Sequence, residues 1–296
     1  DILVDLAGHT GMTSRLPLLA RRLAPVQVTY LGYPDTTGLP AMDYRFTDGI
    51  VDPEGDAEGR ASERLVRFAP TAWTYQPPPD APEPAGLPYA TRGYVTFGCF
   101  NSPSKITDGM LARWGLLLAA VPGARLRLKG QGMGEAGPRA RYAERFGRAG
   151  LPADRVDLIE RTPDTRSHLA HYREVDIALD TFPYHGTTTT CEALWMGVPV
   201  VSLAGDRHAS RVGVSLLNAI GRPQWVASTP EDYLRIAREL AGDPVALADE
   251  ARTLRERVRQ SPLGDHAGQS RRFAAALRQC WTAWCGGRGT APGSPG

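Results

Sequence analysis

The segment best suited to bind a ligand runs from Asp180 to Glu192. It reads Asp-Thr-Phe-Pro-Tyr-His-Gly-Thr-Thr-Thr-Thr-Cys-Glu and follows an apolar run that indicates a buried strand. Four threonines open a predicted helix, whose first N–H groups lack partners within the helix and carry a partial positive charge. Gly186 lets the backbone approach a ligand closely, so a diphosphate would be stabilised here. Glu192 lies one turn into the helix, where its carboxylate can accept hydrogen bonds from both ribose hydroxyls.

The same threonines could serve only to cap a helix, since one Thr is enough for an N-cap. Four in succession exceed what capping needs, because Thr is a mediocre helix former. The segment also follows the carboxyl end of a predicted strand, where open α/β sheets bind their ligands. We therefore interpret it as a loop that faces a ligand.

Two further candidates follow other predicted strands. Lys105, one of only two lysines in the chain, comes after Val95–Phe100 at the start of a predicted helix. The helix dipole disfavours a cation there unless an anion such as a phosphate is bound, although a solvated surface lysine is the alternative. His9 follows the first predicted strand, Ile2–Leu6, and could act as a base or merely hydrogen-bond a substrate. A structural histidine fits that position equally well.

His168 and His171 lie three residues apart, on one face of a predicted helix. They lack a third ligand at the usual spacing, so a zinc site is not expected. Their position after a predicted strand suits stacking on a nucleobase, with an exposed surface histidine as the alternative for His171. The chain has no P-loop, no Gly-x-Gly-x-x-Gly after its first strand and no Gly-x-Ser-x-Gly. We therefore expect neither a metal nor another cofactor.

The elements that must position these residues alternate between strands and helices, which predicts parallel, doubly wound sheets. Gln76–Pro84 contains five prolines and marks a stiff linker between two α/β regions with a cleft between them. We predict three parts: 1–85, the C-terminal portion of a first domain; 86–285, a nucleotide-sugar-binding domain that includes the C-terminal helices; and 286–296, a disordered tail. Since function in such sheets concentrates at strand ends, we expect it just after four residues: Phe100, Lys129, Ile159 and Leu179.

The composition narrows the choice of partners. A formal net charge of +2 gives no global field that would recruit nucleic acid, and no apolar run approaches the length of a membrane span. The four cysteines form no CxxC pair, which is typical of thiols in a reduced cytoplasm. The chain opens at Asp1 directly into a strand-like run, so we expect it to be part of a longer protein.

The segments quoted above together resemble the catalytic region of the O-GlcNAc transferase and SPINDLY family. The resemblance spans nearly all of residues 1–285 and is closer in detail to SPINDLY, because animal enzymes have Asn-Gly-His-Thr-Thr where this chain has His-Gly-Thr-Thr-Thr. It implies a GT-B-type α/β fold of two doubly wound domains with a cleft between them, the first truncated at its N-terminus. The matching blocks occur in order: Asp1–Thr10, Ala24–Asp48, Val95–Thr107, Leu179–Val201 and Ser210–Leu217.

The resemblance also implies roles for single residues. Lys105 matches a lysine that contacts the donor diphosphate and steadies the leaving group, and Glu192 matches the acid that binds the ribose. His168 matches a histidine stacked near the base, and His9 is the local candidate for a catalytic base. The remaining donor-binding positions lie beside the base, at the phosphates and beside the donor sugar: Thr162, Pro163, His185, Gly186, Thr187, Thr188, Thr189, Leu31, Gly32 and Pro34.

The function implied is an inverting transfer of a sugar from a nucleotide sugar to Ser or Thr hydroxyls of a protein acceptor, without a metal. The donor is UDP-GlcNAc, as in animal-type members, or GDP-fucose, as in plant SPINDLY. Family members also carry tetratricopeptide repeats upstream, which present the protein acceptor. Two alternatives remain open: a GT-B glycosyltransferase that acts on a non-protein acceptor, and a nucleotide-sugar-binding module without activity.

Overall fold

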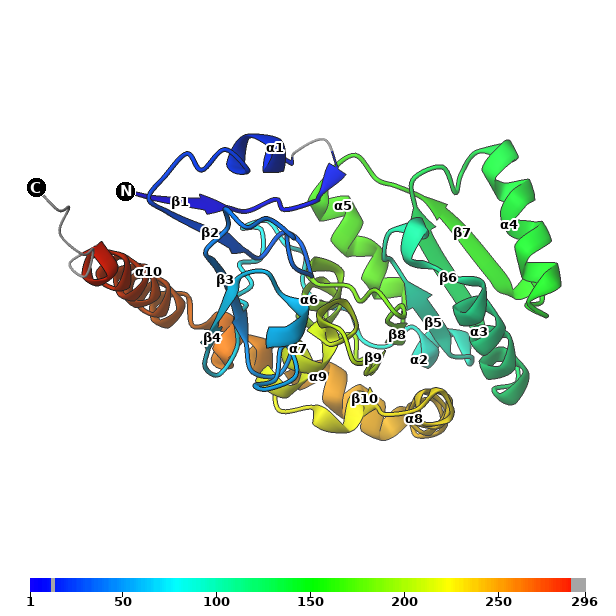
Figure 1. Ribbon diagram of the computed structural model, residues 1–296. Coiled ribbons are helices and arrows are strands. Elements are labelled where there is room, and N and C mark those ends of the chain that lie inside the picture. Colours follow the sequence, from blue (N-terminus) through cyan, green and yellow to red (C-terminus); the bar gives the residue numbers. More distant parts are fainter. Residues whose placement is uncertain (12–13, 289–296) are drawn as a thin grey trace, which may run out of the picture. The chain divides into compact units, whose positions relative to one another are not determined.

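The computed structural model describes residues 1–11 and 14–288, which divide into two compact units (Figure 1). Unit 1 comprises Asp1–Thr74 and the chain from Asp265 onward, and unit 2 comprises Tyr75–Gly264. The sequence predicts instead a boundary after residue 85 and groups all C-terminal helices with the second domain. The last helix, α10 (His266–Arg288), differs because its side chains pack on the first sheet.

The attachment of α10 to unit 1 has a clear physical basis. The ring of Phe273 lies 5.5 Å from that of Tyr30 and 5.6 Å from that of Phe46. Gln269 donates from Nε2 to the hydroxyl of Tyr30 and to the carbonyl of Ala72, both at 3.0 Å. Of the tail predicted over 286–296, residues 286–288 continue α10, and 289–296 lie outside the described residues.

Unit 1 is built on a parallel four-stranded sheet in the order β1-β2-β3-β4. A short helix, α1 (Leu16–Leu19), follows the first strand, and Leu16, Leu19 and Met42 form a small buried cluster. Because the four strands are parallel, the loops that follow them lie at one edge of the sheet. The strands are β1 (Ile2–Asp5), β2 (Val26–Tyr30), β3 (Tyr44–Asp48) and β4 (Arg64–Phe68).

Unit 2 contains a parallel six-stranded sheet in the order β10-β9-β8-β5-β6-β7. Numbered from its own first strand, this is the 3-2-1-4-5-6 order of a doubly wound dinucleotide-binding fold. The chain reverses direction across the sheet between β5 and β8, and ligands bind beside such a switch point. The strands are β5 (Thr96–Cys99), β6 (Arg125–Gly130), β7 (Val156–Glu160), β8 (Ile177–Leu179), β9 (Val200–Leu203) and β10 (Val226–Ala227).

The helices of unit 2 connect these strands and pack against them. Helix α3 begins where the sequence predicts, since the Thr107 side chain accepts a hydrogen bond from the N–H of Met110 at 3.2 Å. The helices are α2 (Tyr89–Arg92), α3 (Asp108–Ala120), α4 (Ala136–Arg148), α5 (Thr165–Ala170), α6 (Thr188–Trp195), α7 (Val212–Ala219), α8 (Pro230–Gly242) and α9 (Pro244–Gln260).

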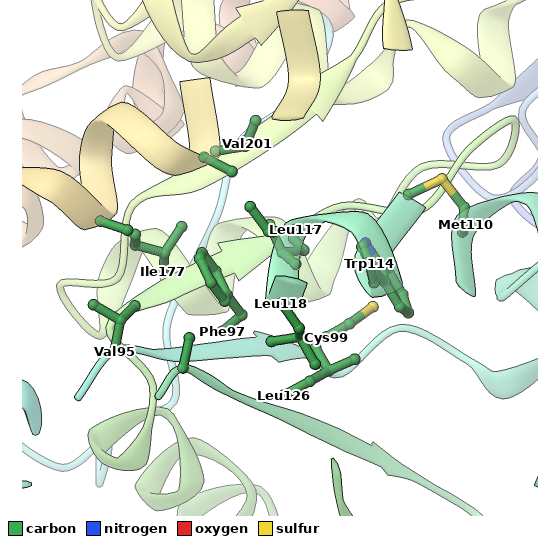
Figure 2. Packing of buried hydrophobic residues seen from close by; sticks show 14 of the residues in the cluster. Val95, Phe97, Cys99, Met110, Trp114, Leu117, Leu118, Leu126, Ile177 and Val201 are labelled. Carbon is green, nitrogen blue, oxygen red and sulfur yellow. The ribbon is translucent and has the colours of Figure 1, made fainter. Parts of the chain in front are cut away.

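The core of unit 2 holds the central strands in place beneath the loops that follow them. Figure 2 shows β5 and β6 side chains packed with those of α3, and Trp114 of α3 is fully buried. Its indole N–H donates to the hydroxyl of Tyr233 at 3.2 Å, which in turn donates to the carbonyl of Asp180 at 3.0 Å. The core is therefore linked to the first residue after β8.

Strands β1 to β9 and helices α3 to α6 lie where the sequence predicts strands and helices, with ends shifted by a few residues. Helices α1, α2 and α7 and strand β10 were not predicted as elements, and the predicted C-terminal helices are α8, α9 and α10. In the part of the chain that the structure describes, no helix is long and apolar enough to cross a membrane.

Candidate functional site

The buried carboxylate of Asp180 organises the loop that follows β8. Its side chain is only 3% exposed, and Oδ1 accepts from the N–H of Gly186 at 2.8 Å and from the N–H of Thr181 at 2.9 Å. Its other oxygen accepts from the hydroxyl of Ser202 on β9 at 2.6 Å. Several donors on one buried carboxylate compensate for its desolvation, so Asp180 fixes the backbone of the whole loop.

Asn101 joins this loop to the end of β5. Its Nδ2 donates to Oδ1 of Asp180 at 2.9 Å and to Oγ1 of Thr181 at 2.8 Å, while its Oδ1 accepts from the hydroxyl of Thr189. Gly186 packs so closely here that a Cβ would lie 2.4 Å from Oδ1 of Asn101 and 2.3 Å from Oγ1 of Thr189. Only glycine fits at this position, because Asn101 and Thr189 fill the space of a side chain. The loops after β5 and β8 are therefore packed tightly together at the switch point.

Lys105 extends from the β5 loop over the β8 loop. Its Nζ donates to the carbonyl of His185 at 2.7 Å and lies 3.8 Å from the centre of the Tyr184 ring. Burial lowers the pKa of Lys105, and the nearby carboxylate of Asp180 partly opposes this effect. The ammonium has three donors and, among the described residues, donates to this one acceptor. The arrangement favours an anion as its further partner.

Helix α6 starts at Thr188, beside Lys105. The preceding residue, Thr187, makes no side-chain capping bond, so the first N–H groups of the helix are not capped in that way. Thr188 is exposed and Thr187 and Thr189 are partly exposed, whereas Thr190 is buried. A cation and a helix start without a side-chain cap thus lie on adjoining loops, which is an arrangement suited to a diphosphate.

A cavity of about 430 Å³ opens at the carboxyl ends of four strands of unit 2. Function was expected just after Phe100, Lys129, Ile159 and Leu179, and each of these four strand ends contributes to the lining of the cavity. The lining comprises Phe100–Pro103 after β5, Lys129–Gln131 at β6, Arg161–Thr165 and His168 after β7, and Thr188, Thr189 and Glu192 after β8.

Three ionisable side chains form a hydrogen-bonded row in this cavity. Nζ of Lys129 lies 2.7 Å from Nδ1 of His168, and Nε2 of His168 lies 2.9 Å from Oε2 of Glu192. Lys129 is 3% exposed and Glu192 is 8% exposed. Burial lowers the pKa of Lys129, and the carboxylate of Glu192 acts in the opposite direction. The row connects β6, α5 and α6 across the cavity.

Thr162 and Pro163, the residues predicted beside the base, lie in the same cavity. In the described part of the chain, the hydroxyl of Thr162 is buried without a hydrogen-bond partner. His171 does not line this cavity; its ring lies against Phe100, with the two ring centres 6.5 Å apart. The histidine pair is therefore divided, and only His168 faces the space in which a base would lie.

His185, which was predicted among the donor-binding positions, has its side chain buried in the protein. The ring is fully buried, with Nε2–H donating to the carbonyl of Leu203 at 2.8 Å and Nδ1 accepting from the N–H of Gly213 at 3.0 Å. Both ring nitrogens are thus used within the protein, and the ring supports the loop from below. What His185 offers near the ligand position is its carbonyl, which Lys105 already occupies.

The other predicted residues belong to unit 1, where two loops pack together. Nε2–H of His9 donates to the carbonyl of Thr37 at 2.9 Å, so Nδ1 of this exposed ring is the nitrogen that does not bond to Thr37. Leu31 has a φ of +73° and is 52% exposed. A Cβ on Gly32 would lie 1.8 Å from the carbonyl oxygen of Leu6, so only glycine fits against the first loop. Pro34 is partly exposed on the same loop.

Sequence reasoning missed the residues that hold these loops. Glu63, buried at the start of β4, accepts from the N–H of Thr37 and from the hydroxyl of Thr36, both at 2.7 Å. Asp180 and Asn101 play the same part in unit 2. A signal existed for the last two, because each is the first polar residue after a buried strand; Glu63 carried no such signal. Within the described ranges no group of three or more His, Cys, Asp or Glu is placed to hold a metal ion.

Comparison with known proteins adds independent information. The sequence profile of glycosyl transferase family 41 matches residues 1–74 and 86–274. A protein of Petunia hybrida named as a probable UDP-N-acetylglucosamine–peptide N-acetylglucosaminyltransferase SPINDLY is 42% identical over 287 residues. That alignment covers 97% of this chain and 31% of the relative, so the chain spans about a third of the length of such relatives.

Two solved structures of GT-B glycosyltransferases resemble the chain. A mutant O-GlcNAc transferase of Thermobaculum terrenum superposes with a TM-score of 0.90 at 40% identity, covering 97% of this chain and 54% of that one. Sucrose-phosphate synthase of Thermosynechococcus elongatus gives a TM-score of 0.61 at 14% identity, with 95% and 74% covered, and shows the likeness of fold alone. The predicted GT-B-type fold class of parallel α/β units is thereby confirmed.

Proposed function

The chain belongs to glycosyl transferase family 41, and from that premise we propose that it transfers a sugar, with inversion, from a nucleotide sugar to Ser or Thr hydroxyls of proteins. The observation that carries the proposal is the joint placement of Lys105 and the start of α6 at the switch point of a dinucleotide-type sheet. Both supply positive charge at one position without a metal. Charge of that kind stabilises a departing diphosphate.

Residues that follow different strands of unit 2 bind different parts of the donor. Lys105 and the N–H groups of Thr188 and Thr189 neutralise the charge that grows on the diphosphate as the sugar leaves. Glu192 accepts hydrogen bonds from the ribose, and the base lies toward Thr162 and His168. Thr187 stands at the phosphates, and Gly186 allows the loops after β5 and β8 to pack closely.

Unit 1 supplies the acceptor side. The family resemblance assigns the loop of Leu31, Gly32 and Pro34 to the donor sugar, and Glu63 keeps that loop in one conformation. His9, with Nε2–H already committed to a carbonyl, offers Nδ1 as the local candidate for a base. In the longer protein, upstream tetratricopeptide repeats present the acceptor. We place the protein in the cytoplasm, with its cysteines as free thiols.

UDP-GlcNAc is the donor we favour, because the names of the plant relatives and of the Thermobaculum enzyme refer to N-acetylglucosamine transfer. GDP-fucose is the other candidate, because the motifs resemble SPINDLY in detail. Calorimetric titration of the chain with UDP-GlcNAc and GDP-fucose, side by side, separates the two. Binding of neither nucleotide sugar would overturn the proposal.

Transfer itself is tested with a Ser- and Thr-rich peptide pool and mass spectrometry of the products. A mass increase of one sugar, released from Ser or Thr by β-elimination, is the expected result. Tight nucleotide binding without a glycopeptide, but with transfer to lipid or glycan acceptors, would instead select a glycosyltransferase with a non-protein acceptor. Binding without product on any acceptor would select a nucleotide-sugar-binding module.

A further inference from the structure

Lys129 is the second lysine of the chain, and none of the steps proposed above uses it. It lies near the carboxyl end of β6 with its side chain buried, and its Nζ lies 2.7 Å from Nδ1 of His168. A buried ammonium is costly unless it finds acceptors, so its choice of a histidine nitrogen needs an explanation. The contact continues from His168 to Glu192, at 2.9 Å, on the wall of the cavity.

The chemistry of the three groups gives the row a direction. An ammonium can only donate, so Nδ1 of His168 must be unprotonated and accept. The single ring proton then lies on Nε2, which donates to Oε2 of Glu192. An imidazolium would place a second proton on Nδ1, directly against the ammonium. Lys129 therefore holds the ring neutral and in one tautomer.

This direction determines what Glu192 can offer to a ligand. Its Oε2 is committed to His168, and in the described part of the chain no hydrogen bond reaches Oε1. The side chain of Glu192 is buried on the cavity wall, and its Oε2 is fixed by His168. The lone pairs of Oε1 therefore have a defined direction. A carboxylate held in this way can accept from a vicinal diol with little loss of conformational freedom.

We propose that Lys129 is a positioning residue. It holds His168 in its Nε2–H tautomer and thereby orients Glu192 to accept hydrogen bonds from the ribose hydroxyls of the donor. The proposal rests on the proposed function, in that Glu192 meets the ribose. It adds a source of specificity: the protein distinguishes ribonucleotides from 2′-deoxyribonucleotides through a residue that does not touch them.

The state of the ring can be measured directly by ¹⁵N NMR of the imidazole nitrogens. His168 is assigned among the six histidines by the signal lost in His168→Gln. At neutral pH the wild type should show a protonated Nε2 and an unprotonated Nδ1. A protonated Nδ1 in the wild-type protein would overturn the proposal without any need for a Lys129 variant to fold.

Lys129→Met tests the link from the lysine to the ring. Without the ammonium, nothing opposes a second proton on Nδ1, and Glu192 favours the imidazolium. The other groups whose charges reach Lys129 are Arg161 and Glu160, and Lys129 in turn acts on His171. Because these remain, a change in His168 is assigned to Lys129 alone. At neutral pH the ¹⁵N spectrum of His168 should then show more protonation at Nδ1 than in the wild type, and an unchanged spectrum would contradict the proposal.

The functional readout is the ratio of affinities for UDP and 2′-deoxy-UDP, or for GDP and 2′-deoxy-GDP if the wild type prefers guanine nucleotides. A hydrogen bond to a charged acceptor predicts a ratio of about 10 or more in the wild type and about 3 or less in Lys129→Met. A ratio that stays at the wild-type value would overturn the proposal. If the wild type binds no nucleotide, the proposed function fails. The NMR experiment still shows which nitrogen of His168 carries the proton, and so still tests the role of Lys129.

Arg127→Met is the matched control. Arg127 lies two residues earlier on the same strand and also loses a positive charge, but its partner is Glu174, at 3.1 Å, and not His168. We expect this variant to keep the wild-type ribose ratio and the wild-type His168 spectrum. If Arg127→Met reproduces the effect of Lys129→Met, a general loss of positive charge explains both, and the proposed role for Lys129 is contradicted.

Discussion

The two lysines of this protein follow neighbouring strands of one sheet, yet their surroundings differ. Lys105, after β5, donates to the carbonyl of His185 and lies over the ring of Tyr184, while its remaining donors have no acceptor among the described residues. Lys129, on β6, is buried against a histidine that continues to a carboxylate. The pKa of each lysine is lowered, and burial is the main cause in both cases. The same residue type at equivalent ends of strands has therefore been given two kinds of partner.

The difference teaches how to distinguish a group that acts on a ligand from one that positions another group. A cation whose protein partners are a neutral carbonyl and a ring gains most from an incoming anion, since among the described residues no carboxylate accepts a hydrogen bond from it. A cation already engaged in a directed row gains little from a ligand but determines the protonation of its neighbours. The following experiments test this contrast.

Lys105→Met should have the largest effect. Loss of one group that stabilises charge on a leaving diphosphate should lower turnover by about 10²-fold, or about 3 kcal/mol of barrier, with a smaller effect on nucleotide affinity. Turnover is measured as peptide glycosylation at saturating donor. The contrast between the lysines predicts that Lys129→Met reduces turnover much less than this.

Arg139→Met serves as the control for Lys105→Met. Arg139 is exposed on α4 and its removal changes the net charge by the same amount. Wild-type turnover in Arg139→Met, together with unchanged thermal unfolding of Lys105→Met, assigns the loss to the site. If Lys105→Met keeps more than about a third of wild-type turnover, less than 1 kcal/mol is lost and Lys105 does not stabilise the leaving group.

Gly186→Ala should destabilise the loop beneath Lys105. A Cβ at 2.3 to 2.4 Å from Thr189 and Asn101 must push both away, which should lower the free energy of unfolding by about 2 kcal/mol. Urea unfolding measures this change, and nucleotide affinity should fall with it. Gly137→Ala is matched, because its Cβ would meet nothing within 4 Å on helix α4 and should not destabilise the protein. Equal stability of the two variants would mean that the β5 and β8 loops are less tightly joined than their contacts indicate.

Much of the fold was predictable because it depends on local patterns. Short apolar runs identify every strand of the two sheets except β10, and Thr107 marks the start of α3 through its capping oxygen. The return of α10 to unit 1 was not predictable, because it depends on Phe273 and Gln269 meeting Tyr30 far away in the sequence. No local pattern encodes such a contact.

The site divides in the same way. Lys105, Glu192 and the threonines of α6 follow strand ends, so their type and place in the sequence indicate ligand binding. For residues that act by positioning another residue, neither the residue type nor the place in the sequence indicates that role. Lys129 and His168 were each visible in the sequence, but their contact at 2.7 Å joins two strand ends and required the structure. The burial of the His185 ring was not predictable either, because the residues before it, Pro183 and Tyr184, are exposed.

Glu192→Gln should weaken nucleotide binding by about 5- to 10-fold, the loss expected when a charged acceptor becomes neutral. The amide oxygen can still accept from Nε2–H of His168, so the protein should fold normally. Binding of the 2′-deoxynucleotide should change less, and calorimetry measures both. Glu160→Gln removes the same charge from an exposed carboxylate that accepts from Gly132 and Gly134, and it should leave affinity unchanged. If both variants weaken binding equally, Glu192 does not contact the ribose.

The smallest effect concerns pH, and it tests the feature that the two lysines share. Each has a pKa in the folded protein below its value of 10.5 in the unfolded chain. Between those two pKa values the unfolded chain holds a proton that the folded protein has released, so stability rises with pH in that window. The stability of the wild type relative to Lys105→Met, and relative to Lys129→Met, should therefore increase from about pH 8 to 10, by less than about 1 kcal/mol. Urea unfolding at several pH values measures both differences, and the cysteines and tyrosines cancel because all three proteins carry them. A difference that falls with pH would mean that the ammonium is stabilised by its surroundings and not disfavoured by burial. If that occurs for Lys105 alone, then Asp180 already serves as its anion, and the contrast between the two lysines would be lost.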